Sequence, residues 1–225
     1  MVVDTMTFKE IWSEINKDRD GIIKHKLEDA NKALRKKVLA SSNNDKIIRL
    51  APIHLKSRTT NLNHCLIVFC LGKNDFKKKG PIFILYSYIY WKFGIHAFML
   101  GGNFDMLNVY TPHFFDRYRE RNLAEPTWDI EKVMEIYFIN NSVTYNSAAI
   151  ETGKAFNEKY PNSIFASTNE GVLLGTKHPD NIYVYKTFLS KNLLRVQQTD
   201  LNLTQDEIIK KYQKEMYGTD TISQE

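Results

Sequence analysis

Three basic side chains, His113, Arg117 and Arg121, follow one another at intervals of four residues. Thr111 and Pro112 precede them, and this pair is typical of a helix start. Thr can cap a helix, and Pro lacks the N–H that would be unpaired at the first helical position. Residues four apart lie on one helix face, so the imidazole and the two guanidinium groups lie side by side. Because a helix N-terminus also favours anions, the spacing predicts a phosphate-handling surface with one titratable group.

RNA cleavage is the chemistry that we expect of this surface. A neutral imidazole at His113 can take the proton from a ribose 2′-hydroxyl as a general base. Arg117 or Arg121 can hold the scissile phosphate and stabilise the charge that builds on it. The alternative is structural: Arg117 pairs with Glu120, three residues further on, and His113 caps its own helix. The motif alone leaves both interpretations open.

A second group of candidate residues falls late in the chain, where apolar and polar side chains alternate from Ile182 to Ser190. Alternation predicts a strand with Ile182, Val184 and Phe188 on one face and Tyr183, Tyr185 and Thr187 on the other. In the preceding strand, Gly171 and Gly175 allow close approach of the backbones, and Thr176 adds a hydroxyl. A Thr hydroxyl and Tyr rings under a basic helix suit a nucleotide-sized ligand. The alternative is that Thr187 is only a good strand former.

The elements that must position these residues follow from the hydrophobic period. Residues 1–45 predict a helical hairpin or one kinked helix, because Thr7 and Glu10 form a capping box and apolar residues follow at helical spacing. Residues 46–110 change to the period of strands and predict an antiparallel meander. Its strands are expected at 47–55, 65–71, 82–91, 95–100 and 105–110. Lys77, Lys78 and Lys79 are interpreted as a solvated hairpin turn in preference to the alternative of a binding patch.

Residues 111–217 predict helices followed by strands. Thr127 is the expected cap of a second helix, and a third helix covers about 146–160. Three strands are expected at 163–168, 171–176 and 182–190, followed by a helix near 193–198 and by a capping box at Thr204 and Glu207. Residues 218–225 are expected to form a flexible tail. The chain is therefore expected to form a single α+β domain over 1–225, with helices packed on an antiparallel sheet.

Composition narrows the class of partner. The 225 residues hold 31 Lys and Arg against 26 Asp and Glu, which is a net charge of +5 with a pI near 9.0. This balance leans towards acidic partners such as nucleic acid, although the scattered charges argue against a continuous basic face. No apolar run is long enough to span a membrane and no signal peptide is visible, so we expect a cytoplasmic protein. Cys65 and Cys70 lie five residues apart, on opposite faces of a strand, and should not pair.

Known cofactor and metal motifs are missing from the sequence. It holds no P-loop, no Gly-rich dinucleotide turn, no nucleophile elbow and no His-Glu-x-x-His, so we expect no cofactor. The six histidines do not stand at metal-ligand spacing. His54 and His64 can meet on adjacent strands, but a zinc site needs three or four ligands. We therefore expect no metal site.

The order of the motifs along the chain resembles that of a known group of proteins. A helix with His-x-x-x-Arg-x-x-x-Arg, further helices, and antiparallel strands that end with a Thr resemble the RelE, BrnT and barnase-like group of small ribonuclease toxins, over about residues 111–190. The resemblance implies a metal-independent, toxin-like endoribonuclease with catalytic His113, Arg117, Arg121 and Thr187. It implies nucleotide contacts at Tyr185, Tyr183 and Thr176, RNA as substrate and an antitoxin as protein partner.

The competing class is a non-enzymatic bacterial or phage protein that binds a protein partner or nucleic acid. In that case the His-Arg helix is a structural cluster of ion pairs. The geometry of the site distinguishes the two classes. A cleft that His113 and Arg117 share with Thr187 or Tyr185 favours the enzyme, and burial of His113 and Arg117 in ion pairs favours the binding protein.

Overall fold

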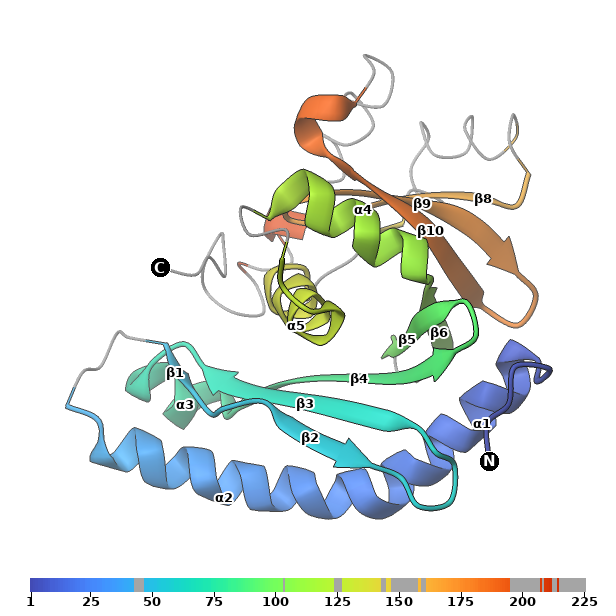
Figure 1. Cartoon of the computed structure of the whole chain (residues 1–225). Helices are drawn as coiled ribbons and strands as arrows, with labels where there is room; N and C mark the ends of the chain where they lie inside the picture. The colour runs from blue at the N-terminus through green and yellow to red at the C-terminus, as the bar shows by residue number, and fades with distance from the viewer. Residues whose placement is uncertain are drawn as a thin grey trace. The chain divides into compact units, whose positions relative to one another are not determined.

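The computed structural model describes residues 1–42, 47–102, 104–123, 127–142, 145–146, 158, 161–194, 207, 209–211 and 214. We expected a single domain, and residue contacts group the chain into two compact units, Met1–Trp91 (unit 1) and Lys92–Glu225 (unit 2) (Figure 1). Both units combine helices with a mostly antiparallel sheet, which confirms the expected α+β class. Within the described residues, no helix has both the length and the apolar character that a membrane crossing needs.

Unit 1 begins with one kinked helix. Helix α1 (Phe8–Asp18) continues through a π-helical segment, η1 (Arg19–Ile23), into α2 (Lys24–Ala40). The capping box is confirmed, because the Glu10 amide donates to Thr7 Oγ1 and the Thr7 amide donates to Glu10 Oε2. The kink lies at Gly21, whose backbone angles (φ −98°, ψ −106°) are not helical.

The strands of unit 1 are antiparallel. They are β1 (Ile48–Arg49), β2 (Ile53–Lys56), β3 (Asn63–Cys70) and β4 (Ile82–Trp91). Strand β3 pairs with each of the other three. The expected strand at 47–55 is divided in two at Pro52, whose missing N–H cannot donate to a sheet ladder. Helix α2 lies along these strands (Figure 1) and packs Ala30, Leu34 and Val38 on Leu66, Val68 and Cys70.

The three consecutive lysines lie on a helix, so the hairpin-turn interpretation was wrong. Helix α3 spans Lys73–Lys79, and Gly80 follows it with a φ of +78°. Two local features stabilise this short helix. Asp75 and Lys79 form an i, i+4 ion pair at 3.8 Å, and Phe76 packs against the apolar core under α2.

The sheet of unit 2 has the strand order β5-β6-β10-β9-β8-β7. All pairs are antiparallel except β6 with β10, which run parallel. The strands are β5 (Gly94–Gly101), β6 (Met106–Tyr110), β7 (Tyr145–Asn146), β8 (Ser163–Ser167), β9 (Gly171–His178) and β10 (Ile182–Ser190). The last three confirm the expected late strands. A short 3₁₀-helix, η3 (Lys191–Leu193), follows β10.

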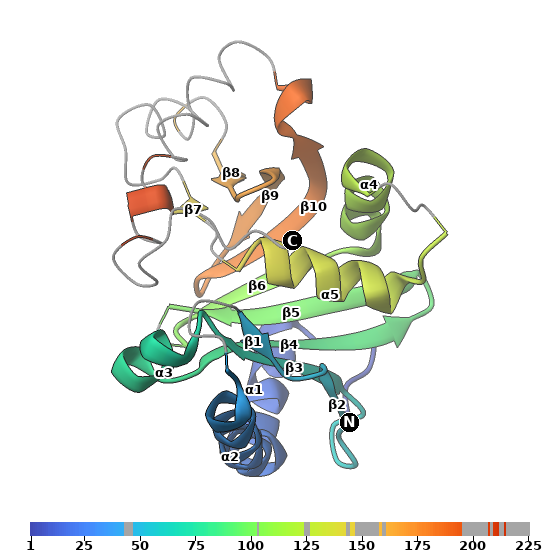
Figure 2. The ribbon, with the colours of Figure 1, turned by 90° about the vertical axis from the view of Figure 1, so that its left-hand side faces the viewer.

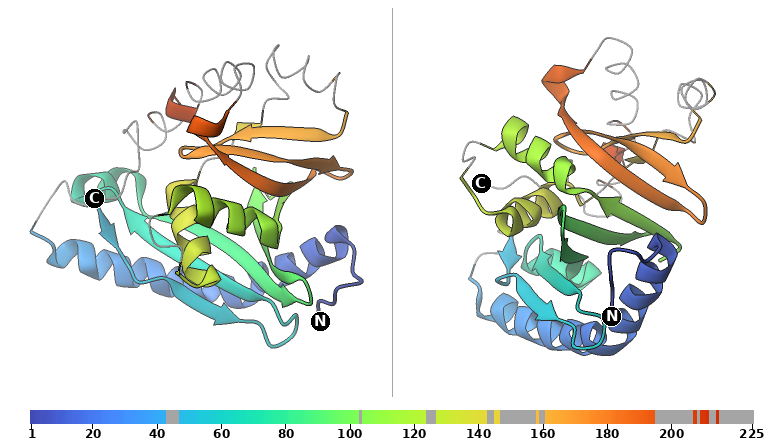
Figure 3. Two further views of the ribbon diagram at one scale, coloured as in Figure 1. Left: turned by 45° about the horizontal axis from the view of Figure 1, so that its top comes forward. Right: turned by 45° about the vertical axis from the view of Figure 1, so that its right-hand side comes forward.

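Two helices of unit 2 follow β6. Helix α4 (Pro112–Asn122) packs on β10 and contacts α5 (Ile130–Asn140) (Figure 3). Asp129 caps α5, because its Oδ1 accepts the Lys132 amide at 2.8 Å, so the expected cap at Thr127 was wrong. As expected, Phe114 and Tyr118 are buried. They join an aromatic core that also holds Tyr110, Phe115, Tyr137, Phe138, Tyr185 and Phe188.

Some expectations fall outside the described residues. The predicted helix at 146–160 does so except for Asn146, which lies in β7, and Glu158, which is helical. The predicted helix at 193–198 lies outside from residue 195 onward. The Thr204 end of the late capping box and the tail at 218–225 lie outside as well.

Candidate functional site

The His-Arg motif lies on α4 as the sequence predicted. His113 is exposed in the first turn, and Arg117 is half-buried one turn further on. Arg117 Nε donates to His113 Nε2 at 3.3 Å, and Arg117 Nη1 pairs with Glu120 Oε2 at 2.7 Å. In this contact the guanidinium N–H is the donor and the Nε2 atom of His113 is the acceptor. Thr111 occupies the N-cap position, but its hydroxyl makes no capping hydrogen bond.

Arg121 is directed to the sheet rather than to His113. Its Nη1 donates to the backbone carbonyl of Phe188 in β10. The last residue pair between β6 and β10 is Tyr110 with Tyr185. Phe188 comes three residues later in β10, so Arg121 contacts the part of β10 that no longer pairs with β6. The third arginine of the helix, Arg119, donates to Asp116 at 3.1 Å. All three α4 arginines therefore have acceptors within the chain.

A β-bulge separates the two strand residues that the sequence placed together. Tyr185 pairs with Gly175, whereas Thr187 pairs with Leu174, the next residue along β9. The register shift at this point reverses the alternation, so Tyr185 and Thr187 lie on opposite faces. Tyr185 and Phe188 both pack in the aromatic core under α4, at 5.2 Å from the Tyr110 ring and 5.1 Å from the Tyr118 ring respectively.

The other two predicted binding residues, Tyr183 and Thr176, also lie on opposite faces of the sheet. Tyr183 shares the helix-covered face with Tyr185, and the Lys177 ammonium lies 5.7 Å from its ring centroid. Thr176 shares the opposite face with Thr187, and its hydroxyl lies 3.4 Å from His178 Nε2. The structure thus brings His113 and Arg117 together but does not place Tyr185, which is 2% exposed, in a common cleft with Thr187.

A carboxylate that the sequence analysis did not consider lies beside α4. Glu170, in the turn between β8 and β9, accepts hydrogen bonds from Tyr118 Oη at 2.6 Å, Asn140 Nδ2 at 2.8 Å and Asn141 Nδ2 at 2.6 Å. The Glu170 amide donates in turn to Asn141 Oδ1 at 3.2 Å. The turn is therefore tied to α4 and to the end of α5. Within the described residues, the side-chain donors to this half-buried carboxylate are neutral.

A buried polar network in unit 1 was also missed. His64 on β3 contacts Ser87 Oγ on β4 through Nδ1 at 2.8 Å, and Asp18 Oδ2 through Nε2 at 3.1 Å. Asp18, at the end of α1, also accepts hydrogen bonds from the hydroxyls of Ser57 and Thr60. A histidine within the apolar run of β3 was the available signal, because a buried polar group needs partners.

The contacts of this network have the order of a Ser-His-Asp triad, but they do not form an active site. Ser87 is 1% exposed and His64 is fully buried, so a substrate cannot reach the hydroxyl. Burial lowers the pKa of His64, and the Asp18 carboxylate opposes that shift. The network joins α1 to β3 and β4 and therefore stabilises unit 1.

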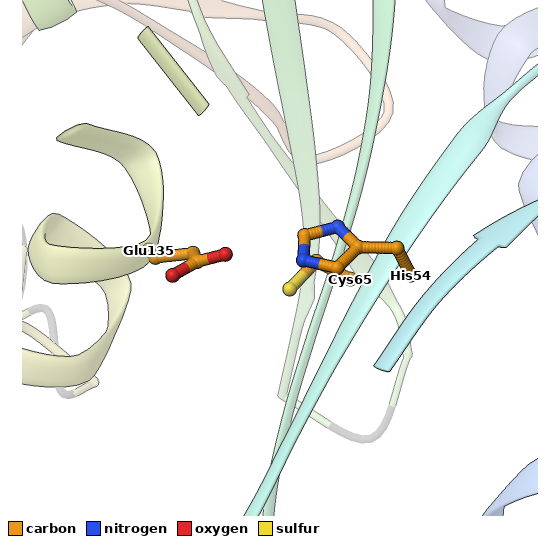
Figure 4. Close-up of side chains that lie close together, drawn as sticks. All are labelled: His54, Cys65 and Glu135. Atoms are coloured by element: carbon orange, nitrogen blue, oxygen red, sulfur yellow. The ribbon is translucent and has the colours of Figure 1, made fainter. Parts of the chain in front are cut away.

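The histidine pair considered for a metal does not meet. His54 on β2 pairs with Cys65 on β3, and Figure 4 shows these two side chains beside each other. His64 pairs with Leu55 instead, so its side chain lies on the opposite face of the sheet. Among the described residues of unit 1, His54 and Cys65 therefore offer two possible ligands, and a zinc site takes three or four. Glu135, labelled in the same figure, belongs to unit 2, where its carboxylate pairs with Lys132 Nζ at 3.3 Å.

Comparison of the chain with protein-family models, with curated proteins and with solved structures found no match.

Proposed function

We propose that this chain binds RNA on the His-Arg face of α4 and cleaves it without a metal ion or cofactor. The observation that carries the proposal is the 3.3 Å contact between Arg117 Nε and His113 Nε2 in the first turns of a helix. This contact places an imidazole beside a permanent positive charge. A general base and a phosphate ligand are the two groups that attack by the 2′-hydroxyl needs.

The reaction starts when the hydrogen bond between Arg117 and His113 is replaced by one between Arg117 and a phosphate oxygen. A phosphate oxygen is a stronger acceptor for a guanidinium than a neutral imidazole, so bound RNA takes the place of His113 as the partner of Arg117. His113 Nε2 is then free to remove the proton of the 2′-hydroxyl. The 2′-oxygen forms a bond to phosphorus and the bond to the 5′-oxygen breaks, while the leaving oxygen takes a proton from water. The products are a 2′,3′-cyclic phosphate and a 5′-hydroxyl.

Incubation of the purified chain with total RNA tests this proposal. Cleavage should persist in EDTA and leave cyclic phosphate ends, and His113→Ala should slow it by about 10²–10⁴-fold, the usual contribution of a positioned general base. His25→Ala is the matched control, because His25 is exposed on α2 and takes no part in the scheme. Unchanged cleavage by the His113 variant, or cleavage that EDTA abolishes, would contradict the mechanism.

A second candidate function is the binding of a protein partner, such as an antitoxin, by a non-enzymatic cytoplasmic protein of a bacterium or phage. It is favoured by the ion pair between Arg117 and Glu120 and by the hydrogen bond from Arg121 to Phe188, which hold these guanidinium groups without a ligand. Affinity capture distinguishes the candidates. One tight protein partner that Arg117→Glu releases, together with intact RNA, would favour the second.

A further inference from the structure

The two units carry charges of opposite sign. Residues 1–91 contain 17 Lys and Arg against 9 Asp and Glu, a net charge of +8. Residues 92–225 contain 14 against 17, a net charge of −3. The basic character of the protein therefore belongs to unit 1, although the candidate chemistry of α4 belongs to unit 2.

Most of this positive charge lies on two helices. The C-terminal half of α2, residues 32–40, holds four Lys and Arg and no acidic residue, and α3 holds four Lys against Asp75. We name these eight side chains the basic face: Lys32, Arg35, Lys36, Lys37, Lys73, Lys77, Lys78 and Lys79. Seven of the eight are exposed, and Lys73 is half-buried.

The two helices lie together at one end of unit 1. Lys73 Nζ, at the start of α3, donates to the carbonyl of Ser41, which directly follows α2, at 3.2 Å. Phe76 of α3 packs against the apolar core under α2, and Figure 2 shows the two helices beside β1. Lys32, Arg35 and Lys36 stand opposite the apolar stripe of α2, so this group faces solvent.

Contacts among the described residues leave most of this charge in place. Lys37 and Lys73 donate to the backbone carbonyls of Arg49 and Ser41, and a carbonyl does not neutralise an ammonium. Asp75 pairs with Lys79 at 3.8 Å and offsets a single charge. The basic face therefore keeps a positive potential.

Stabilisation of the helix ends explains only some of the Lys and Arg residues in the basic face. Lys37 and Lys77 to Lys79 lie in the last turns of their helices, where cations favour the helix dipole by about 0.3–1 kcal/mol each. Lys32, Arg35 and Lys36 lie before the last turn of α2, are exposed, and form no ion pair with an acidic side chain in the part of the chain that the structure describes. These neighbouring positive charges repel one another, which destabilises the folded chain, and binding of a polyanion would remove that repulsion.

We propose that the basic face binds the phosphodiester backbone of a nucleic-acid strand, independently of base sequence. Two adjacent helices with phosphate-binding side chains and no aromatic readout group fit backbone recognition. A lipid surface is less suitable, because Leu39 is the only large apolar side chain described as exposed on these two helices. The inference goes beyond the proposed function, since it requires no cleavage and involves unit 1 alone.

Binding of the full chain to labelled single strands about 30 nucleotides long, measured by fluorescence anisotropy across a salt series, tests this proposal. DNA is the first probe, because it lacks the 2′-hydroxyl and cannot be cleaved by the proposed chemistry, and RNA in a His113→Ala background is the second. Lys32→Gln, Arg35→Gln and Lys36→Gln are combined in one variant, and Lys77→Gln, Lys78→Gln and Lys79→Gln in another. The control combines Lys186→Gln, Lys210→Gln and Lys211→Gln, three exposed lysines of unit 2.

Each basic-face variant should weaken binding by roughly 10²-fold near 0.1 M salt and reduce the salt slope by about 2, the value for three lost contacts to a single strand. The control should bind like the wild type, and circular dichroism should show all variants folded. Equal losses in the control, wild-type affinity in the variants, or no binding of either nucleic acid would overturn the inference. Binding to phosphatidylserine vesicles in place of nucleic acid would overturn it as well. Cleavage of RNA that fails while strand binding persists would contradict only the proposed function.

Discussion

The hydroxyl of Tyr118 donates a 2.6 Å hydrogen bond to the carboxylate of Glu170, 52 residues further along the chain. The Tyr118 ring is fully buried against Tyr137 and Phe188. Burial, with the Glu170 carboxylate adding to it, raises the pKa of the Tyr118 hydroxyl far above its ordinary value. The hydroxyl therefore stays protonated and acts as a permanent donor. Through Tyr118, the buried side of α4 is thus attached to the turn between β8 and β9. His113, on the other side of the same helix, remains exposed.

Loss of the Tyr118 ring and loss of its hydroxyl should lower the free energy of unfolding by different amounts. Tyr118→Ala should lower the free energy of unfolding by about 3–5 kcal/mol, as deletion of a buried aromatic side chain does. Tyr118→Phe keeps the ring and should cost about 1–2 kcal/mol, because Glu170 retains its two Asn donors. Urea unfolding measures both. Tyr183→Phe, at a half-exposed position, is the control, and a Tyr118→Ala protein with wild-type stability would contradict the burial of this face.

The pH dependence of stability should reflect His64. Burial lowers its pKa in the folded protein, whereas in the unfolded chain it titrates near 6.5. The unfolded state therefore binds the proton first, and stability should fall as the pH falls below about 6.5, by at most about 1.4 kcal/mol per pH unit for this group. Burial also lowers the pKa of His96, which contributes in the same direction.

Two measurements separate the histidines. Unfolding curves of His64→Gln should show a flatter pH dependence than those of the wild type, with the contribution of His96 remaining. If that variant does not fold, NMR titration of the wild-type ring decides the question, because a His64 midpoint at or above 6.5 contradicts the prediction.

A glycine on β9 should resist substitution. A methyl group at Gly175 would collide with the carbonyl oxygen of Val184 on β10, which is a backbone atom and cannot rotate away. Gly175→Ala should therefore cost roughly 1–3 kcal/mol, the range for overpacking. Gly21→Ala is the control, since no atom lies within 4 Å of a Cβ at that position. Thermal melting compares the two, and equal melting temperatures would exclude a close approach of β9 and β10.

The arginines of α4 should differ in their contribution to RNA cleavage. Arg117 contacts His113, whereas Arg119 donates to Asp116 and to the carbonyl of Trp128. If the proposed function is correct, Arg117→Ala should reduce kcat/KM by about 10²-fold or more through the loss of charge stabilisation. Arg119→Ala removes the same charge from the same helix and should have a much smaller effect. Equal losses would indicate a general electrostatic effect rather than a positioned group.

Local patterns were sufficient for much of the fold. The capping box at Thr7 and Glu10 was confirmed, because such caps depend on residues a few positions apart. The start of α4 at Thr111 and Pro112 was confirmed as well, although the Thr111 hydroxyl makes no capping hydrogen bond. The late strands were confirmed because Gly and Asn mark their turns. The lysine run was misread, because its helix is stabilised by the packing of Phe76 under α2, a contact with no signal in the local sequence.

The sequence by itself determined that His113 and Arg117 share an exposed helix face, since helical geometry places residues four apart beside each other. It also determined that Phe114 and Tyr118 form the buried stripe of that helix. Only the tertiary structure decided which strand residues lie under α4. A single bulge after Tyr185 turns Thr187 to the opposite face, and a one-residue shift in a period of two cannot be read from alternation alone. Tertiary structure alone also joined Asp18 to His64 and Tyr118 to Glu170, because these polar contacts depend on distant segments that burial brings together.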